Sequence, residues 1–389
     1  MKVLILHNEY QQPGGEDTVV NNESKLLQGA GHLVYLEIFS NHNIKGPVSK
    51  ILAAVGMVFS LTSFFRVKKM IKKIKPDVVH VHNFFPLLSP SVFYACKSLK
   101  IPVVLTLHNY RTLCPTAVLM YEGHVCERSL KNGPWWAIKK KAYRNSLIAT
   151  FFLTLMIDFH KKFGTWSNAV DRFIVLSESS KQKFISAGFP SNKIIKKPNF
   201  VDISYRERNS NFQFLYVGRL SEEKGVNVIK GALNFLSESV KISLIGDGPL
   251  KSDFQKNEKI DLKGRLNSNQ VFDEMNKHYA LLLPSICLET FGMTVIEAYA
   301  NGLPVIASRI GALEELVEHQ VTGLLFEAGN PESLTQAMLW ALDHPQEMYQ
   351  MGLNARKKYE QSYTAQKNLQ QLEDIYMDAI QSCNYERPN

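Results

Sequence analysis

The chain has 389 residues, a formal net charge of +9, and 45% hydrophobic residues. This length suggests two or three domains, because a domain usually takes roughly 100–200 residues. The apolar stretch 51–65 contains no charged residue and is too short for a membrane-spanning helix, which needs about 20 apolar residues. The odd number of cysteines, five, and the lack of an export signal before the first apolar run predict reduced thiols and a cytoplasmic protein.

Charge is distributed unevenly between the two halves. Residues 1–205 contain 27 Lys and Arg against 12 Asp and Glu, whereas the rest contain 18 against 24. The basic half suits an acidic partner, either nucleic acid or a membrane surface. Two apolar stretches in it, 51–65 and 147–157, are flanked by lysines, a pattern that favours an anionic membrane interface. The alternative is a buried helix with a solvated basic end. We therefore expect a peripheral membrane protein and no nucleic-acid partner.

The first half alternates expected strands and helices. Short apolar runs predict strands at 2–7, 31–38, 77–82, 102–107 and 172–176. Gly14 and Gly15 precede a helix that Asp17 or Thr18 would cap, which gives a βαβ opening where backbone can approach a ligand. A plain tight turn is the alternative. His108 follows the strand at 102–107, at the sheet edge where ligands bind, and is a candidate for substrate contact. Its alternative role is a histidine satisfied by neighbouring backbone.

The second half repeats this alternation after a polar stretch, 204–211, which predicts a domain boundary. Its strands are expected at 212–217, 241–245, 260–263, 281–283 and 305–307. The fold class is thus α/β, with two doubly wound parallel-sheet (Rossmann-like) domains facing a cleft. The predicted limits are 1–203 for the first domain, 204–362 for the second, and 363–389 for a terminal helix that packs back across both. Ligand would lie between the carboxyl edges of the sheets.

The loops at the carboxyl edge of the second sheet carry charges suited to a nucleotide-sugar. Arg219 and Lys224 suit a diphosphate, and Glu289 and Glu297, eight positions apart, suit hydroxyl groups. A helix beginning near Gly292 would direct unpaired N–H groups at an anion. The alternative is an ordinary helix with one acid before it and one exposed acid. Neither GxxxxGK[ST] nor an opening GxGxxG is present, which counts against a nucleoside triphosphatase and a nicotinamide enzyme.

A metal site is not expected. Cys114 and Cys126 bracket a loop that also contains His124, but zinc usually takes four ligands and no CxxC is present. Spacing alone leaves open whether the two thiols pair.

Several motifs together resemble the retaining nucleotide-sugar glycosyltransferases of family 4, which have the GT-B fold. They are GRLSEEKG at 218–225, IGDGP at 245–249, LETFGMTVIEA at 288–298, NGLPVIAS at 301–308 and VTGLLF at 321–326. The resemblance covers almost all of the second half. It reaches the first half through Gly14-Gly15, VHVHN at 79–83 and TLHNYRTLCP at 106–115.

The resemblance implies a role for each matching residue. Arg219 and Lys224 would neutralise the donor diphosphate, Glu289 would bind the transferred sugar, and Glu297 the ribose. His108 would reach across the cleft to the sugar near its reacting carbon. The further donor-binding positions are Gly14, Gly15, Gly248, Arg265, Leu266, Thr290, Phe291, Gly292 and Met293. Backbone N–H groups of 291–293 would hold phosphate, and 264–266 would border the base. Anomeric configuration would be retained, with no cofactor and no divalent metal, since Arg and Lys replace the metal.

Departures from the family pattern are few. Ser129 and Ala142 stand where some relatives carry cysteines, so a four-thiol metal site is not available, and Phe200 replaces a glycine at the domain junction. Relatives often build bacterial surface polysaccharides on a lipid carrier, so the implied acceptor is a lipid-linked saccharide at the inner membrane face. A soluble acceptor is the alternative. Competing functions are a non-catalytic nucleotide-sugar binder and an isomerase or phosphorylase with a similar cleft.

Overall fold

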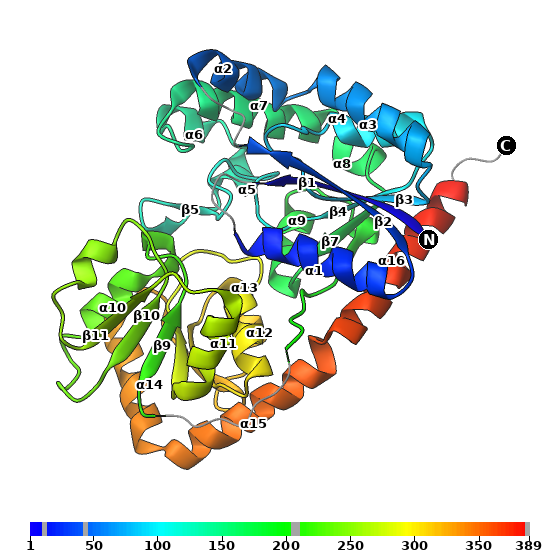
Figure 1. Cartoon of the computed structure of the whole chain (residues 1–389). Coiled ribbons are helices and arrows are strands. Elements are labelled where there is room, and N and C mark those ends of the chain that lie inside the picture. The colour runs from blue at the N-terminus through cyan, green and yellow to red at the C-terminus, as the bar shows by residue number, and fades with distance from the viewer. Residues whose placement is uncertain (10–13, 42–45, 204–210, 386–389) are drawn as a thin grey trace. The chain divides into compact units, whose positions relative to one another are not determined.

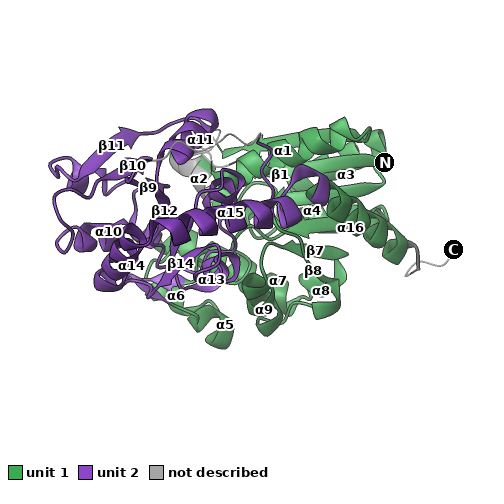
Figure 2. Cartoon of the chain, turned by 90° about the horizontal axis from the view of Figure 1, so that it is seen from below, with its two compact units in different colours: residues 1–119, 126–198, 368–389 green, residues 120–125, 199–367 purple. Residues whose placement is uncertain are grey.

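The computed structural model describes residues 1–9, 14–41, 46–203 and 211–385, and Figure 1 shows them as a ribbon. Figure 2 colours the two compact units into which the chain divides. Unit 1 comprises 1–119, 126–198 and 368–389, and unit 2 comprises 120–125 and 199–367. Most of the predicted boundary stretch, residues 204–210, lies outside the described residues, as do residues 11–13 of the loop before Gly14.

Unit 1 is built on a parallel six-stranded sheet in the order β2-β1-β3-β4-β7-β8. Its strands are β1 (Lys2–Glu9), β2 (Leu33–Ser40), β3 (Val78–Asn83), β4 (Val103–Thr106), β7 (Arg172–Val175) and β8 (Ile194–Lys196). The central strands are continuous apolar runs because helices cover both faces of such a sheet. In β1 the side chains of Val3 through Leu6 are fully buried. The expected strands are therefore confirmed in this unit.

Ten helices are described in or entering unit 1. They are α1 (Gly15–Gly29), α2 (Gly46–Gly56), α3 (Leu61–Ile74), α4 (Ser91–Ser98), α5 (Arg128–Asn132), α6 (Trp136–Lys139), α7 (Leu147–Lys162), α8 (Thr165–Asn168), α9 (Glu178–Ser186) and α16 (Ala365–Tyr385). Serines cap three of them, as Ser177 does for α9. Asp17 does not begin α1 as predicted: Gly14 is the N-cap, and Asp17, three residues on, accepts the Gly14 N–H at 2.6 Å. None of the described helices is long and apolar enough to cross a membrane.

Unit 2 contains a second parallel six-stranded sheet, in the order β11-β10-β9-β12-β13-β14. Its strands are β9 (Phe214–Val217), β10 (Ile242–Ile245), β11 (Ile260–Gly264), β12 (Ala280–Leu283), β13 (Val305–Ser308) and β14 (Gly323–Phe326). The helices are α10 (Val226–Ala232), α11 (Ser268–Lys277), α12 (Met293–Ala300), α13 (Gly311–Leu316), α14 (Pro331–Asp343) and α15 (Pro345–Ser362). A short 3-10 helix, Lys251–Phe254, follows β10.

A short antiparallel hairpin from the first half of the chain belongs to unit 2. It consists of β5 (Met120–Tyr121) and β6 (His124–Val125), and its residues cluster with the second sheet rather than the first. Strands of two residues are too short for any hydrophobic period, so the sequence did not predict them.

Candidate functional site

Three neighbouring strands of unit 2, β10, β9 and β12, end in loops that pack backbone against backbone. A Cβ on Gly225, where φ is +70°, would lie 1.7 Å from the Pro284 carbonyl oxygen. A Cβ on Gly248 would lie 2.3 Å from the carbonyl oxygen of Leu220. Both distances are shorter than any real contact, so only glycine fits. Gly248, predicted as a donor-binding residue, thus has a packing role in bringing the loops after β9 and β10 together.

The loops after β9 and β12 bring the side chains of Lys224 and Glu289 into contact. Lys224 Nζ lies 2.8 Å from Glu289 Oε1, and Ser285 Oγ donates to the same oxygen at 2.5 Å. Burial disfavours the Lys224 charge, but the Glu289 carboxylate together with Cys287 and Glu223 favours it more, so the pKa of Lys224 is raised. Lys224 is therefore a fixed positive charge. Its side chain stays 35% exposed, which leaves room for a second anionic partner.

Arg219 lies on the same loop, and its backbone is anchored. Tyr216 donates its hydroxyl to the Arg219 carbonyl at 2.7 Å, and the Ser221 N–H donates to it at 2.9 Å. The guanidinium is exposed and has no ion pair within the described parts of the chain. Ser221 in turn donates to the Glu223 carboxylate at 2.6 Å, which holds the turn before Lys224. The loop thus presents one tethered cation and one free cation.

The N-terminus of α12 carries four predicted residues in a row. Thr290 and Phe291 are buried, with the Phe291 ring 6.2 Å from that of Tyr363, while Gly292 is the N-cap and Met293 the first helical residue. The N–H groups of residues 291–293 donate to no acceptor among the described residues. Unpaired N–H groups at a helix start, together with the helix dipole, attract an anion.

Glu297 lies on the second turn of α12 and is partly buried. Its carboxylate makes no hydrogen bond or ion pair with any described residue, and burial raises the pKa of Glu297 to about 7. An unsatisfied buried carboxylate is costly unless a ligand donates to it. Arg265 and Leu266 follow β11, at the far end of the sheet, where the Arg265 side chain is exposed.

His108 belongs to unit 1, as do Gly14 and Gly15. It follows β4, and its Nε2 lies 3.0 Å from Nδ1 of His82. Burial lowers the pKa of His108 to about 4, so the ring is neutral at neutral pH. At this nitrogen the partner is another imidazole.

Sequence reasoning missed a buried polar cluster behind His108. Lys197 Nζ lies 2.7 Å from Glu23 Oε1, and both side chains are almost fully buried. Glu23 Oε2 lies 3.4 Å from His82 Nε2. His80 bonds Tyr376 at 2.8 Å and Thr106 at 2.7 Å. The signal was present in VHVH, since alternate strand residues share a face, but Glu23 and Lys197 are distant in sequence.

The cluster has the geometry of a metal site but not its chemistry. Ligand atoms of Glu23, His80 and His82 lie within 4.8 Å of one another. However, both His80 nitrogens already have partners, and the Lys197 ammonium supplies the positive charge beside Glu23. A metal ligand must offer a free lone pair. Glu23 Oε2 and His82 Nε2 have no hydrogen-bond partner among the described residues, but without His80 they are only two ligands, beside an ammonium group, and two ligands are too few for an ion.

Comparison with known proteins places the chain in a family. Two family models match it consecutively: "Glycosyltransferase Family 4" at residues 13–205 and "Glycosyl transferases group 1" at residues 201–358. An uncharacterized glycosyltransferase of Methanocaldococcus jannaschii is 26% identical over 97% of this chain and 98% of its own length.

Two further matches carry more informative names. An Escherichia coli UDP-Gal:alpha-D-GlcNAc-diphosphoundecaprenol alpha-1,3-galactosyltransferase is 25% identical over 84% of this chain and 81% of its own. The crystal structure of Anabaena HepE in complex with UDP superposes with a TM-score of 0.69 at 19% identity, covering 96% of this chain and 99% of that one. This likeness establishes a shared fold. The chain belongs to glycosyltransferase family 4, and its two parallel-sheet domains have the GT-B fold.

Proposed function

We propose that the protein transfers a sugar from a nucleotide-diphosphate sugar to an acceptor hydroxyl, with retention of anomeric configuration. One observation carries this proposal: the Lys224–Glu289 pair lies beside the unpaired N–H groups at the start of α12. A fixed cation and a helix N-terminus suit a diphosphate, and a carboxylate beside them suits the sugar hydroxyls. The HepE structure contains UDP, which supports a nucleotide-linked donor.

Each residue then has a task in the transfer. Lys224 and Arg219 offset the charge that grows on the diphosphate as its bond to the sugar carbon breaks. Glu289, held by Lys224 and Ser285, accepts hydrogen bonds from sugar hydroxyls, and Glu297 accepts from the ribose. His108, Gly14 and Gly15 contribute from unit 1. The acceptor oxygen bonds to the same face of the sugar carbon, and its proton passes to the leaving phosphate. No divalent metal is needed in this scheme, because the two cations carry its charge.

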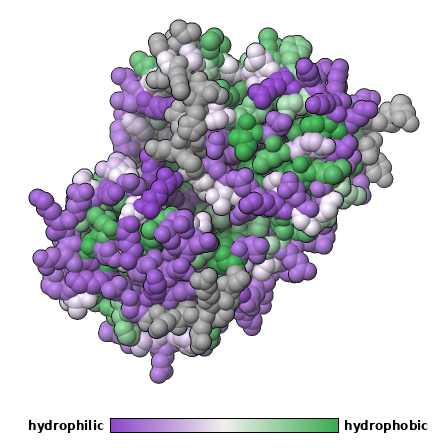
Figure 3. Space-filling model, in the orientation of Figure 1, coloured by the Kyte–Doolittle hydropathy of each residue, from purple (hydrophilic) through white to green (hydrophobic). Residues whose placement is uncertain are grey.

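The proposed acceptor is a lipid-linked saccharide, and the proposed location is the cytoplasmic face of the membrane. The E. coli relative is named for an acceptor on diphosphoundecaprenol. In unit 1, α2 packs against α7, and α3 follows α2 along the chain. These three helices expose large apolar side chains, including Leu52, Leu61, Phe65, Ile148 and Phe163 beside α7. Figure 3 shows hydrophobic residues interrupting the hydrophilic surface along the upper edge of this unit.

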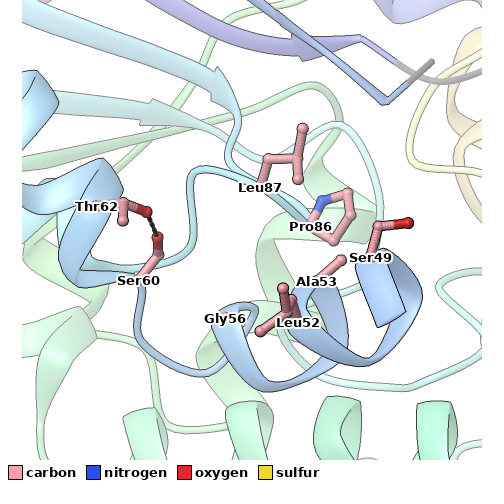
Figure 4. A pocket seen from close by; sticks show the side chains of 8 residues that line it. All are labelled: Ser49, Leu52, Ala53, Gly56, Ser60, Thr62, Pro86 and Leu87. Carbon is pink, nitrogen blue, oxygen red and sulfur yellow. Dashed lines mark hydrogen bonds between the residues drawn. The ribbon is translucent and has the colours of Figure 1, made fainter. Parts of the chain in front are cut away.

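A small hollow of about 260 Å³ opens beside this apolar surface. Leu52, Ala53 and Pro86 line it, with Ser60 and Thr62 on the facing side, where their hydroxyl groups lie 2.9 Å apart (Figure 4). Exposed lysines, Lys69, Lys72 and Lys73, follow on α3. Apolar side chains with flanking lysines suit an anionic bilayer surface.

The test of the donor proposal is a thermal-shift and turnover panel with UDP-, GDP- and ADP-sugars. A ligand that binds the folded state raises the midpoint of unfolding by mass action. We expect the sugars of one nucleotide to raise the midpoint of unfolding. With an acceptor present, the protein should release the nucleoside diphosphate from these sugars. If no series shifts the midpoint, the donor proposal fails. If one binds but no acceptor, soluble or lipid-linked, is glycosylated, the protein is the non-catalytic binder.

The test of the membrane proposal is flotation with vesicles of neutral or anionic lipid. Exposed charges are screened within about 10 Å at 0.1 M salt. We expect binding to anionic vesicles that weakens as salt is raised. Equal binding to neutral vesicles would contradict a basic docking face, and transfer to a soluble saccharide alone would favour the soluble acceptor.

A further inference from the structure

A cavity of about 650 Å³ in unit 2 lies between the β5–β6 hairpin and the loop that leads to Lys224. The hairpin turn is formed by Glu122 and Gly123, both with positive φ, as two-residue turns of this kind require. The turn touches the loop: a Cβ on Gly123 would lie 3.0 Å from Glu222 Oε1. We call this space the hairpin cavity.

The hairpin cavity adjoins the loops of the donor site. Its lining residues Ile286, Ile310 and Ala328 follow β12, β13 and β14. These strands form one end of the sheet, whereas β11, which leads to the predicted base-binding residues 264–266, forms the other. The Ile286 N–H donates to the Glu223 carbonyl at 3.1 Å, so the cavity wall is bonded directly to the turn that holds Lys224.

The polar side chains of the cavity are free to bind. Glu122, His124, Glu222 and Asn227 are exposed, and none makes a side-chain hydrogen bond or ion pair with a described residue. Two carboxylates, an imidazole and an amide offer both acceptors and donors for hydroxyl groups. No lysine or arginine lines the cavity among the described residues, so it is not suited to a phosphate.

The remaining wall is apolar. Val228 is buried, and Ile286, Ile310 and Pro331 lie partly exposed around it. A mostly apolar wall with a few polar groups is typical of small-ligand sites. Sugars match this combination, because a pyranose has C–H faces as well as hydroxyl groups. The two carboxylates repel an acidic sugar, so the expected ligand is neutral or carries an amine.

We propose that the hairpin cavity binds a neutral saccharide of the acceptor, beside the site of transfer. The proposal rests on the proposed function for its link to transfer, but saccharide binding by the cavity can be measured without a donor. The β5–β6 hairpin is then a specificity element that the first half of the chain supplies to unit 2.

The experiment measures glycoside binding to the full chain by saturation-transfer NMR and titration calorimetry. The probes are the methyl glycosides of glucose, galactose, mannose and N-acetylglucosamine, with methyl glucuronide as the acidic comparison. We expect saturable binding of at least one neutral glycoside. Its affinity should fall tenfold or more in each of two cavity variants, Glu222→Gln and His124→Ala. Methyl glucuronide should bind at least tenfold more weakly than its neutral counterpart.

Controls separate this proposal from the donor proposal. Glu258→Gln removes an exposed carboxylate outside the cavity and should leave glycoside binding unchanged. Thermal shifts by UDP, GDP or ADP should be the same in wild type and in both cavity variants. Failure of every neutral glycoside to bind, or binding that the cavity variants leave intact, overturns the saccharide site. Absence of a nucleotide shift overturns the donor proposal instead and leaves the glycoside result standing.

Discussion

The two units differ in how their polar side chains are paired. In unit 1, His80, His82, Glu23 and Lys197 are buried and bonded to one another or to neighbouring side chains. In unit 2, the Arg219 guanidinium, the Glu297 carboxylate and the first N–H groups of α12 have no partner among the described residues. The same architecture thus supports a buried and largely paired cluster in one unit, where Glu23 Oε2 and His82 Nε2 alone of these groups lack a hydrogen bond to a described residue, and an open set of binding groups in the other. Changes in the first should alter stability, and changes in the second should alter ligand binding and turnover.

The largest effect is expected from the buried ion pair of unit 1. Lys197→Met leaves the Glu23 carboxylate buried without its cation, which costs about 3–5 kcal/mol of unfolding free energy. Urea denaturation of the full chain measures it. Glu23→Gln in the same chain should recover most of the loss. Lys196→Met changes the exposed neighbour and should shift stability by less than about 0.5 kcal/mol. Equal effects at 196 and 197 would show that the buried Lys197–Glu23 pair does not stabilise the fold.

The next effect concerns turnover. Lys224→Met removes the tethered cation of unit 2, and we expect kcat to fall about 10²–10³-fold, as for loss of one transition-state charge donor. Lys230→Met, which breaks an exposed pair with Asp253 on the same unit, is the matched control and should keep wild-type turnover. The midpoint of unfolding should change little in Lys230→Met and should fall less in Lys224→Met than in Lys197→Met, because Glu289 is more exposed than Glu23 and keeps its hydrogen bond from Ser285. Wild-type turnover in Lys224→Met would remove it from the mechanism.

Glu297 should show opposite effects on stability and on binding. Its folded pKa of about 7 lies above the unfolded value, so the folded state retains a proton that the unfolded state loses. Stability is therefore lost as pH rises from about 4.5 to 7. Glu297→Gln should raise the free energy of unfolding by about 1–2 kcal/mol at pH 8 and leave it unchanged at pH 4. The same variant should bind the nucleotide about tenfold more weakly at pH 8. A gain that is the same at both pH values would show that the carboxyl does not titrate as described.

The smallest effect is a difference in acid sensitivity. Burial lowers the folded pKa of His82 well below its ordinary value, so the unfolded state binds a proton that the folded state does not. Below about pH 6.5 this costs roughly 1.4 kcal/mol of stability per pH unit. His82→Gln should reduce the slope of unfolding free energy between pH 6 and 5 by about that amount. A slope identical to wild type would mean that His82 is protonated in the fold.

Both sheets and the loop between β12 and α12 were predictable, because continuous apolar runs and the glycines at strand ends are local signals. The sequence also predicted that the loops of Lys224 and Glu289 lie at the same sheet edge, since adjacent parallel strands place their following loops together, but it did not predict that the two side chains pair. Glu297 and Gly292 were placed correctly on and before the helix.

The missed features depend on contacts between distant segments. Lys196 and Lys197 are neighbours, yet one is exposed and the other buried, because only the second meets Glu23, 174 residues away in the chain. The β5–β6 hairpin has strands of two residues, and it belongs to unit 2, where its turn lies against Glu222. The periodicity of the sequence predicts neither the burial of Lys197 against Glu23 nor the place of the hairpin in unit 2.

The hairpin also limits how the polypeptide can be cut and recombined. The chain passes between the units after residues 119, 125, 198 and 367, so a fragment that starts at Asn199 lacks one wall of the hairpin cavity. A chimaera joined at that residue would combine the donor loops of one parent with the hairpin of the other. A chimaera that keeps the hairpin cavity intact therefore needs residues 120–125 and the second half of the chain from the same parent.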